Sequence, residues 1–197
     1  AEELGFRIKH LGIARRAEKG IELRVHPTLI PSEELIANVN GVKNAVLVQA
    51  NAVGPTLYYG AGAGAGPTAS AVVADIIDIV RDISYTEDGA GTIPQLAFEA
   101  LTDMPILSRE EMTTGYYIRL NAEDQTGVLA DVTTILSRAG ISIDAIMQQS
   151  RLKDLIPIVI LTDPIVESKM DEALAQIQAL PAIHGEIVRI RLESLDN

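Results

Sequence analysis

The sequence predicts an α+β protein in two parts, the second with a ferredoxin-like βαββαβ order. Three observations lead to this prediction. Alternating apolar and polar residues before residue 61 are typical of strands, and an amphipathic helical pattern follows them. Strand and helix patterns then alternate again from Gly115 onward. Residues 84–114 carry Gly, Pro and acids without a sustained period, so we interpret them as a linker between residues 1–83 and 115–197.

Composition narrows the class of protein. The 197 residues allow one mid-sized domain or two small ones, and a hydrophobic content of 47% indicates a globular chain. A net charge of -11 opposes binding to nucleic acid or to anionic membranes. No apolar run reaches the ~20 residues of a membrane span, and no basic signal region opens the chain, so we expect a cytoplasmic protein. Cysteine is absent and no histidine has a partner at metal-ligand spacing, so we predict no metal site.

The first part begins with two predicted hairpins. Residues 6–16 and 20–29 flank a charged turn that ends at Gly20, and residues 42–51 and 54–60 form a second pair of strand patterns. The opening AEELGFRIKHLGI is also compatible with the end of an amphipathic helix. Because the chain also lacks an initiator methionine, we interpret it as a fragment of a longer protein.

A helix with one apolar face follows the second hairpin, and we expect it to pack on the sheet. Its stripe has helical spacing and consists of Ala69, Val72, Val73, Ile76, Ile77 and Val80.

Between hairpin and helix, Gly60, Gly62 and Ala65 match the dinucleotide-binding pattern G-x-G-x-x-[GA]. The acid-ended strand that a Rossmann unit requires about 20 residues later is missing, so we reject that fold. Two explanations stay open: a ligand approaches the backbone and the helix N-terminus, or close packing alone requires glycine.

In the second part, the sequence pattern predicts strands at residues 116–122, 141–150, 155–163 and 185–194. A helix between the first two carries a stripe from Val128 to Leu136 and ends at Gly140. Asp163 is predicted to cap the second helix, with Pro164 at its first position. This order gives a four-stranded antiparallel sheet with two helices on one face, and its open edges favour pairing with another copy.

The loop before the first of these helices is the candidate binding site of the second part. Asp124 and Gly127 place a carboxylate beside free helix-end N–H groups, which suits the ammonium and carboxylate of an amino acid. A purely structural role, with Asp124 as a cap and Gly127 permitting the turn, is an equal alternative. His26 and Lys9 are interpreted as packed or solvated strand residues, and no nucleophile–base pair predicts a catalytic residue.

Two stretches carry a resemblance to known families. LGIARRAEKGIELRVHPTLIP and YYGAGAGAGPTASAVVAD resemble the C-terminal part of the catalytic domain of bacterial homoserine dehydrogenase, over residues 1–83. YYIRLNAEDQTGVLADV and the strands after it resemble the regulatory ACT domain. The first resemblance implies part of a mixed-sheet substrate and dimerisation domain, in a homodimer or tetramer.

The resemblance also implies an activity: interconversion of L-homoserine and L-aspartate 4-semialdehyde with NADP or NAD, on the route to threonine and methionine. The family's catalytic residues would precede this chain, which we therefore expect to be inactive alone. Gly60, Gly62 and Gly64 match the loop that lies against the cofactor.

For the ACT part, the resemblance implies feedback regulation by an amino acid, most plausibly threonine, at a site formed when ACT domains pair. The matching positions are Asp124, Gly127, Val128, Leu129, Ile141 and Ile143. Asp163 stands where the family usually has histidine, which leaves the effector's identity open. The alternative is a non-enzymatic ACT sensor of amino acids, with residues 1–83 as a dimerisation scaffold.

Overall fold

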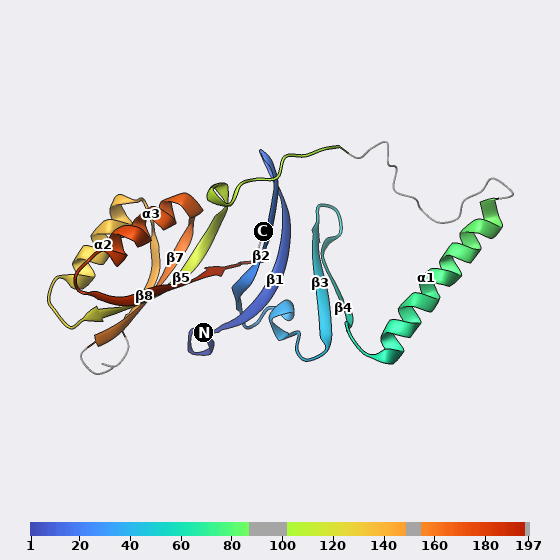
Figure 1. Ribbon diagram of the computed structural model, residues 1–197, viewed down its shortest axis with the longest axis horizontal. Coiled ribbons are helices and arrows are strands. Elements are labelled where there is room, and N and C mark those ends of the chain that lie inside the picture. The colour runs from blue at the N-terminus through green and yellow to red at the C-terminus, as the bar shows by residue number, and fades with distance from the viewer. Residues whose placement is uncertain (87–101, 149–154, 196–197) are drawn as a thin grey trace. The chain divides into compact units, whose positions relative to one another are not determined.

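The computed structural model describes residues 1–86, 102–148 and 155–195 (Figure 1). Its contacts divide the chain into two compact units. Unit 1 comprises Ala1–Ala37 and Met104–Asn197, and unit 2 comprises Asn38–Asp103. The first hairpin therefore lies in the same unit as the second part of the sequence. The boundaries at residues 83 and 115 stay a prediction, and residues 87–101 of the predicted linker lie outside the described residues.

Unit 1 is built on a six-stranded sheet in the order β1-β2-β8-β5-β7-β6. The strands are β1 (Phe6–Ala17), β2 (Gly20–Pro31), β5 (Thr113–Glu123), β6 (Ile143–Gln148), β7 (Leu155–Val166) and β8 (Ile183–Leu192). All neighbours pair antiparallel except β2 and β8, which run parallel. The order β8-β5-β7-β6 is the predicted ferredoxin-like arrangement, which is confirmed.

The first hairpin forms as its alternating pattern predicts. Ala17 pairs with Gly20 across a two-residue turn, and the register continues to Phe6 opposite Pro31. Residues Glu2–Leu4 form only a short 3-10 turn before β1. The interpretation of the opening residues as a helix end is therefore wrong, because pairing with β2 selects the strand period.

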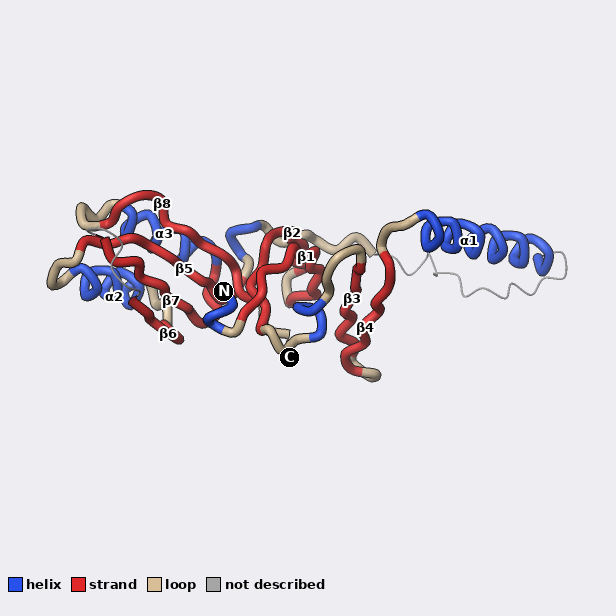
Figure 2. The backbone as a smooth tube through the Cα atoms, turned by 90° about the horizontal axis from the view of Figure 1, so that it is seen from below, coloured by secondary structure: helices blue, strands red, loops and turns tan. Residues whose placement is uncertain are grey.

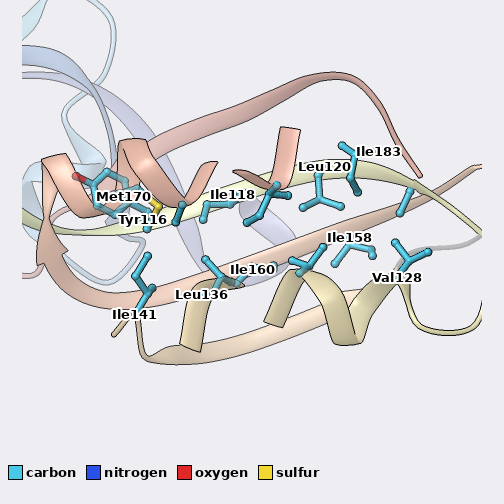
Figure 3. Packing of buried hydrophobic residues seen from close by; sticks show 14 residues of the cluster. Tyr116, Ile118, Leu120, Val128, Leu136, Ile141, Ile158, Ile160, Met170 and Ile183 are labelled. Atoms are coloured by element: carbon cyan, nitrogen blue, oxygen red, sulfur yellow. The ribbon is translucent and has the colours of Figure 1, made fainter. Parts of the chain in front are cut away.

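The main core of unit 1 lies between the sheet and two helices, α2 (Val128–Arg138) and α3 (Glu167–Gln178), which lie together on one face (Figure 1). Its fully buried members come from strands and helices alike (Figure 3). They include Tyr116, Ile118, Leu120, Val132, Leu136, Ile160, Met170 and Ile177. The end of α2 at Gly140 is confirmed: Ala139 is the C-cap, and the Gly140 amide donates to Ser137 O at 3.0 Å.

The predicted start of α3 is wrong. Asp163 and Pro164 belong to β7, and the helix begins at Glu167. The register of β7 against β5 shifts at this point, between Thr114 and Tyr116, so the two residues lie at an irregularity of the ladder. Proline is tolerated at such a place because no ladder hydrogen bond from its nitrogen is needed.

Unit 2 contains β3 (Lys43–Ala50), β4 (Gly54–Ala61) and α1 (Ala65–Thr86). Figure 2 shows the second predicted hairpin as a two-stranded ribbon followed by this helix. The expected packing of the helix on the sheet is wrong for this chain: Val72, Ile76 and Val80 are 52–55% exposed. Over the described residues, no helix has the length and apolar character needed to cross a bilayer.

Candidate functional site

The glycine loop joins β4 to α1 in unit 2. The Gly62 amide donates to Val42 O at 2.9 Å, and a Cβ added at Gly62 would lie 1.7 Å from Asn44 Nδ2. Gly64 has a φ of 123°, a left-handed conformation that favours glycine. Gly64 thus has a conformational reason to be glycine, whereas at Gly62 the exposed Asn44 side chain can move away from an added Cβ. A Cβ added at Gly60 meets no atom within 4 Å, so packing within the described chain does not explain that glycine.

The start of α1 supplies hydrogen-bond donors beside this loop. The Thr68 amide donates to Gly64 O at 3.0 Å and closes the first helical turn. The amides of Ala65 and Gly66 precede that bond, whereas Pro67 has no N–H. Residues 61–68 are exposed, so these donors and the helix dipole can meet an anion here.

The predicted effector loop lies in unit 1, between β5 and α2. Asp124 is exposed, and Gly127, with a φ of 100°, is the N-cap of α2. Val128 is buried and Leu129 packs against the core. The base of the loop is held by Glu123, which accepts from Gln125 Nε2 at 2.6 Å and pairs with His184 Nε2 at 2.7 Å.

The structure does not bring all predicted effector residues together within one copy. Ile141 follows the far end of α2 from Val128, and Figure 3 shows the two side chains at opposite ends of the core. A helix of 11 residues is about 16 Å long. Ile143, which opens β6, also follows that far end. One copy therefore presents two separate groups of predicted site residues.

A buried carboxylate that the sequence analysis missed lies at the start of α3. Glu167 is fully buried, and Tyr116 Oη donates to its Oε2 at 2.6 Å. Arg191 donates to both carboxylate oxygens, from Nε at 2.9 Å and from Nη2. Arg109 Nε donates at 3.2 Å, and Arg189 Nη2 lies 3.3 Å away. Arg189 and Arg191 alternate with Val188 and Ile190 in β8 and so share one face of the strand, but no local sequence signal marks Glu167 as their partner.

Burial and the neighbouring positive charges shift the pKa of Glu167 in opposite directions. Burial by itself raises the pKa of a carboxyl group. Hydrogen bonds from Arg191 and Tyr116, with the charges of Arg191 and Arg189, outweigh burial and lower the pKa of Glu167 to about 2. Burial and the bond to Glu167 raise the pKa of Tyr116 above its ordinary value. Glu167 is therefore ionised and Tyr116 protonated at neutral pH, which identifies a structural network, not an acid–base pair.

Known proteins match both parts of the chain. The homoserine dehydrogenase family matches residues 1–77, and the ACT domain family matches residues 116–180. The two parts of this chain belong to these two families. The chain is 54% identical to homoserine dehydrogenase of Pseudomonas aeruginosa over 100% of this chain and 46% of that protein. It is 51% identical to that of Neisseria gonorrhoeae over 99% of this chain and 45% of that protein.

A solved structure extends the likeness to three dimensions. A homoserine dehydrogenase from Thiobacillus denitrificans matches with a TM-score of 0.88 and 57% identity, over 98% of this chain and 44% of that one. The chain thus spans less than half of the length of these relatives. The homoserine dehydrogenase part, residues 1–77, runs through both units, since its first hairpin shares a sheet with the ACT part.

The low pKa of Glu167 makes the ACT part sensitive to acid. Because the folded pKa of about 2 lies below the unfolded value of about 4.3, the stabilisation is complete above pH 4.3 and is lost as the pH falls towards 2. The carboxylate thereby contributes roughly 3 kcal/mol at pH 7. We predict that E167Q lowers the free energy of unfolding at pH 7 by about 3 kcal/mol, because it removes the buried carboxylate and leaves the partly buried Arg191 without a charged partner. It also flattens the acid dependence of stability.

Urea unfolding at pH 7, 5 and 3 measures both effects. E172Q is the matched control, since it changes an exposed glutamate of the same helix. Equal stability and equal pH dependence of E167Q and E172Q would contradict this account of the network.

Proposed function

We propose that the chain forms part of a homoserine dehydrogenase, which interconverts L-homoserine and L-aspartate 4-semialdehyde with NADP or NAD. Identities of 51–54% to curated homoserine dehydrogenases support the proposal. The observation that carries it is the glycine loop, which lies within the family match at residues 1–77 and leads into the free end of a helix. The reaction belongs to the biosynthesis of threonine and methionine.

In this proposal the loop closes one side of the nicotinamide cofactor site. Gly60 is the informative residue because its backbone is accessible and no described neighbour excludes a side chain. The helix-end amides of Ala65 and Gly66 would face the anionic part of the cofactor. The exposed apolar stripe of α1 would pack on a part of the enzyme that the relatives contain and this chain does not match.

We further propose that the ACT part binds an amino acid, L-threonine first among the candidates, between two copies. Asp124 and the helix-end amides after Gly127 would hold the ammonium and carboxylate groups. Ile141 and Ile143 would come from the partner copy, which accounts for their separation from Val128 within one copy. As the edge strand of the sheet, β6 provides a surface for such pairing.

The cofactor proposal predicts a specific kinetic change in a chimera in which this chain replaces the matching part of the Pseudomonas aeruginosa enzyme. Gly60→Ala should raise the KM for the cofactor about tenfold, since an added methyl group meets the ligand but no protein atom. Gly12→Ala is the control, because its Cβ meets only Val25 Cγ2 at an ordinary 3.9 Å. Assays with NADP and with NAD also decide the preferred cofactor. An inactive chimera would overturn the proposed function. An unchanged KM for the cofactor in the Gly60→Ala chimera would overturn the placement of the glycine loop at the cofactor site.

The effector proposal is tested on this chain by calorimetry. L-threonine should bind at one site per ACT domain or per pair, and more tightly than L-methionine, L-isoleucine or L-lysine. Asp124→Ala should weaken binding at least about tenfold, by loss of a charge-assisted hydrogen bond, while E172Q leaves it unchanged. Absence of binding by all four amino acids would indicate that the ACT part is a pairing device only.

A further inference from the structure

A basic groove lies in unit 1, and its lining contains none of the glycine-loop residues or predicted effector residues. Its cavity of about 500 Å³ is within the size range of small-molecule sites. The groove is formed by β2, β8 and the short segment before β5. The lining residues are Leu23, Arg24, Val25, His26, Arg109, Met112, Arg189 and Arg191. Every charged side chain of this lining is an arginine.

The carboxylates that balance these arginines are not part of the lining. Glu167 and Asp171 pair with the arginines from β8 and the segment before β5. Arg24 Nη2 donates to Glu193 at 2.6 Å, and its Nε lies 2.6 Å from Glu22. The ion pairs orient the guanidinium groups, so the groove is pre-organised, and its lining contains guanidinium groups but no carboxylate.

Three donor atoms of the lining residues have no hydrogen-bond partner among the described residues: Arg24 Nε, which lies 2.6 Å from Glu22 Oε1 in an ion pair, Arg24 Nη1 and His26 Nε2. Arg24 Nη1 is buried, and the side chain of Arg24 is only 3% exposed. His26 Nε2 is buried as well. Buried polar groups in proteins are almost always hydrogen-bonded, and an unsatisfied charged donor is especially costly. The presence of Arg24 Nη1 and His26 Nε2 in one basic groove indicates that an acceptor belongs there.

The surroundings of His26 allow its Nε2 to donate. Thr28 Oγ1 lies 3.0 Å from Nδ1, so the hydroxyl can donate to this nitrogen and leave the ring proton on Nε2. Pro27 O also lies 3.0 Å from Nδ1, so a doubly protonated ring donates from both nitrogens. A neutral ring with its proton on Nδ1 would instead donate to Pro27 O and leave Nε2 as an acceptor, so an anion selects the two forms in which Nε2 carries a proton.

We propose that this groove binds a small oxyanion, a carboxylate or a phosphate group, through Arg24 Nη1 and His26 Nε2. The arginines from β8 and Arg109 supply the surrounding positive charge, and planar guanidinium groups match the geometry of such oxyanions. This site does not depend on the proposed dehydrogenase function.

The test uses this chain and two simple anions, inorganic phosphate and acetate, at constant ionic strength in chloride. Arg24→Gln is unsuitable because it breaks the buried pairs with Glu22 and Glu193 and can unfold the unit. His26→Phe removes one donor and keeps a ring. His10→Phe is the matched control, since His10 is exposed and lies opposite Pro27 in the same hairpin.

The affinity of the anion is measured by NMR titration of the histidine ring signals. Phosphate or acetate should shift the His26 signals, and His26→Phe should weaken binding about tenfold while His10→Phe leaves it unchanged. Tighter binding of phosphate identifies a phosphate ligand, and tighter binding of acetate a carboxylate. Binding of neither anion, or equal affinity in the two variants, would overturn the proposal.

The pKa of His26 provides a second readout. Burial and the charges of Arg191 and Arg24 lower this pKa, against the hydrogen bond to Pro27 and the charge of Glu167. Arg109 and Arg189 line the same groove. A bound anion should raise the pKa of His26 and leave that of His10 unchanged. A His26 pKa that does not respond to either anion would also overturn the proposal.

Discussion

The structure of unit 1 depends on a short parallel contact between β2 and β8. Only Thr28 with Arg191 and Leu29 with Leu192 are in register there. The Glu193 amide extends the contact by donating to Leu29 O at 3.0 Å. Because an isolated two-stranded hairpin is at best marginally stable in water, this contact allows β1 and β2 to become part of a larger sheet. The hairpin of the homoserine dehydrogenase part thus continues the sheet of the ACT part.

Apolar packing and buried charge reinforce the junction from both sides. Leu29 of β2 packs with Tyr117, Val159 and Leu161 of the ACT strands in a second, smaller core. Glu193, just beyond β8, is buried and pairs with Arg15 of β1 and Arg24 of β2. A charge buried in this way is stable only while all its partners stay in place. The hairpin and the ACT sheet are therefore joined by a packed interface, through which a change in one can act on the other.

The sequence predicted what short-range patterns determine. Both hairpins, the stripe of α2 and the ferredoxin-like order followed from periods of 2 and 3.6 residues. The β2–β8 contact could not be predicted this way, because it joins residues far apart in the sequence through two ladder pairs. The stripe of α1 predicted an apolar face but not what covers it. Asp163 and Pro164 carried a valid helix-start signal, which a longer pairing with β5 overrode.

In the candidate sites too, local features could be predicted from the sequence, whereas features that depend on contacts between distant segments could not. Asp124 is not the cap of α2 that the structural alternative predicted, because Gly127 is the N-cap. Glu167 gave no signal, because an acid in the first turn of a helix usually faces solvent and favours the helix dipole. Its burial depends on Tyr116 and on arginines from other segments. Likewise, the unsatisfied donors of Arg24 and His26 became visible only in three dimensions.

We expect the first hairpin and the ACT sheet to unfold as one cooperative unit. Native-state amide hydrogen exchange at increasing denaturant concentration measures the free energy of opening for each strand. Amides of β2, around Leu29, should open with the same free energy as those of β5 and β7, around Ile118 and Ile160. Opening of β2 at a clearly lower free energy, while the ACT strands remain protected, would contradict this expectation.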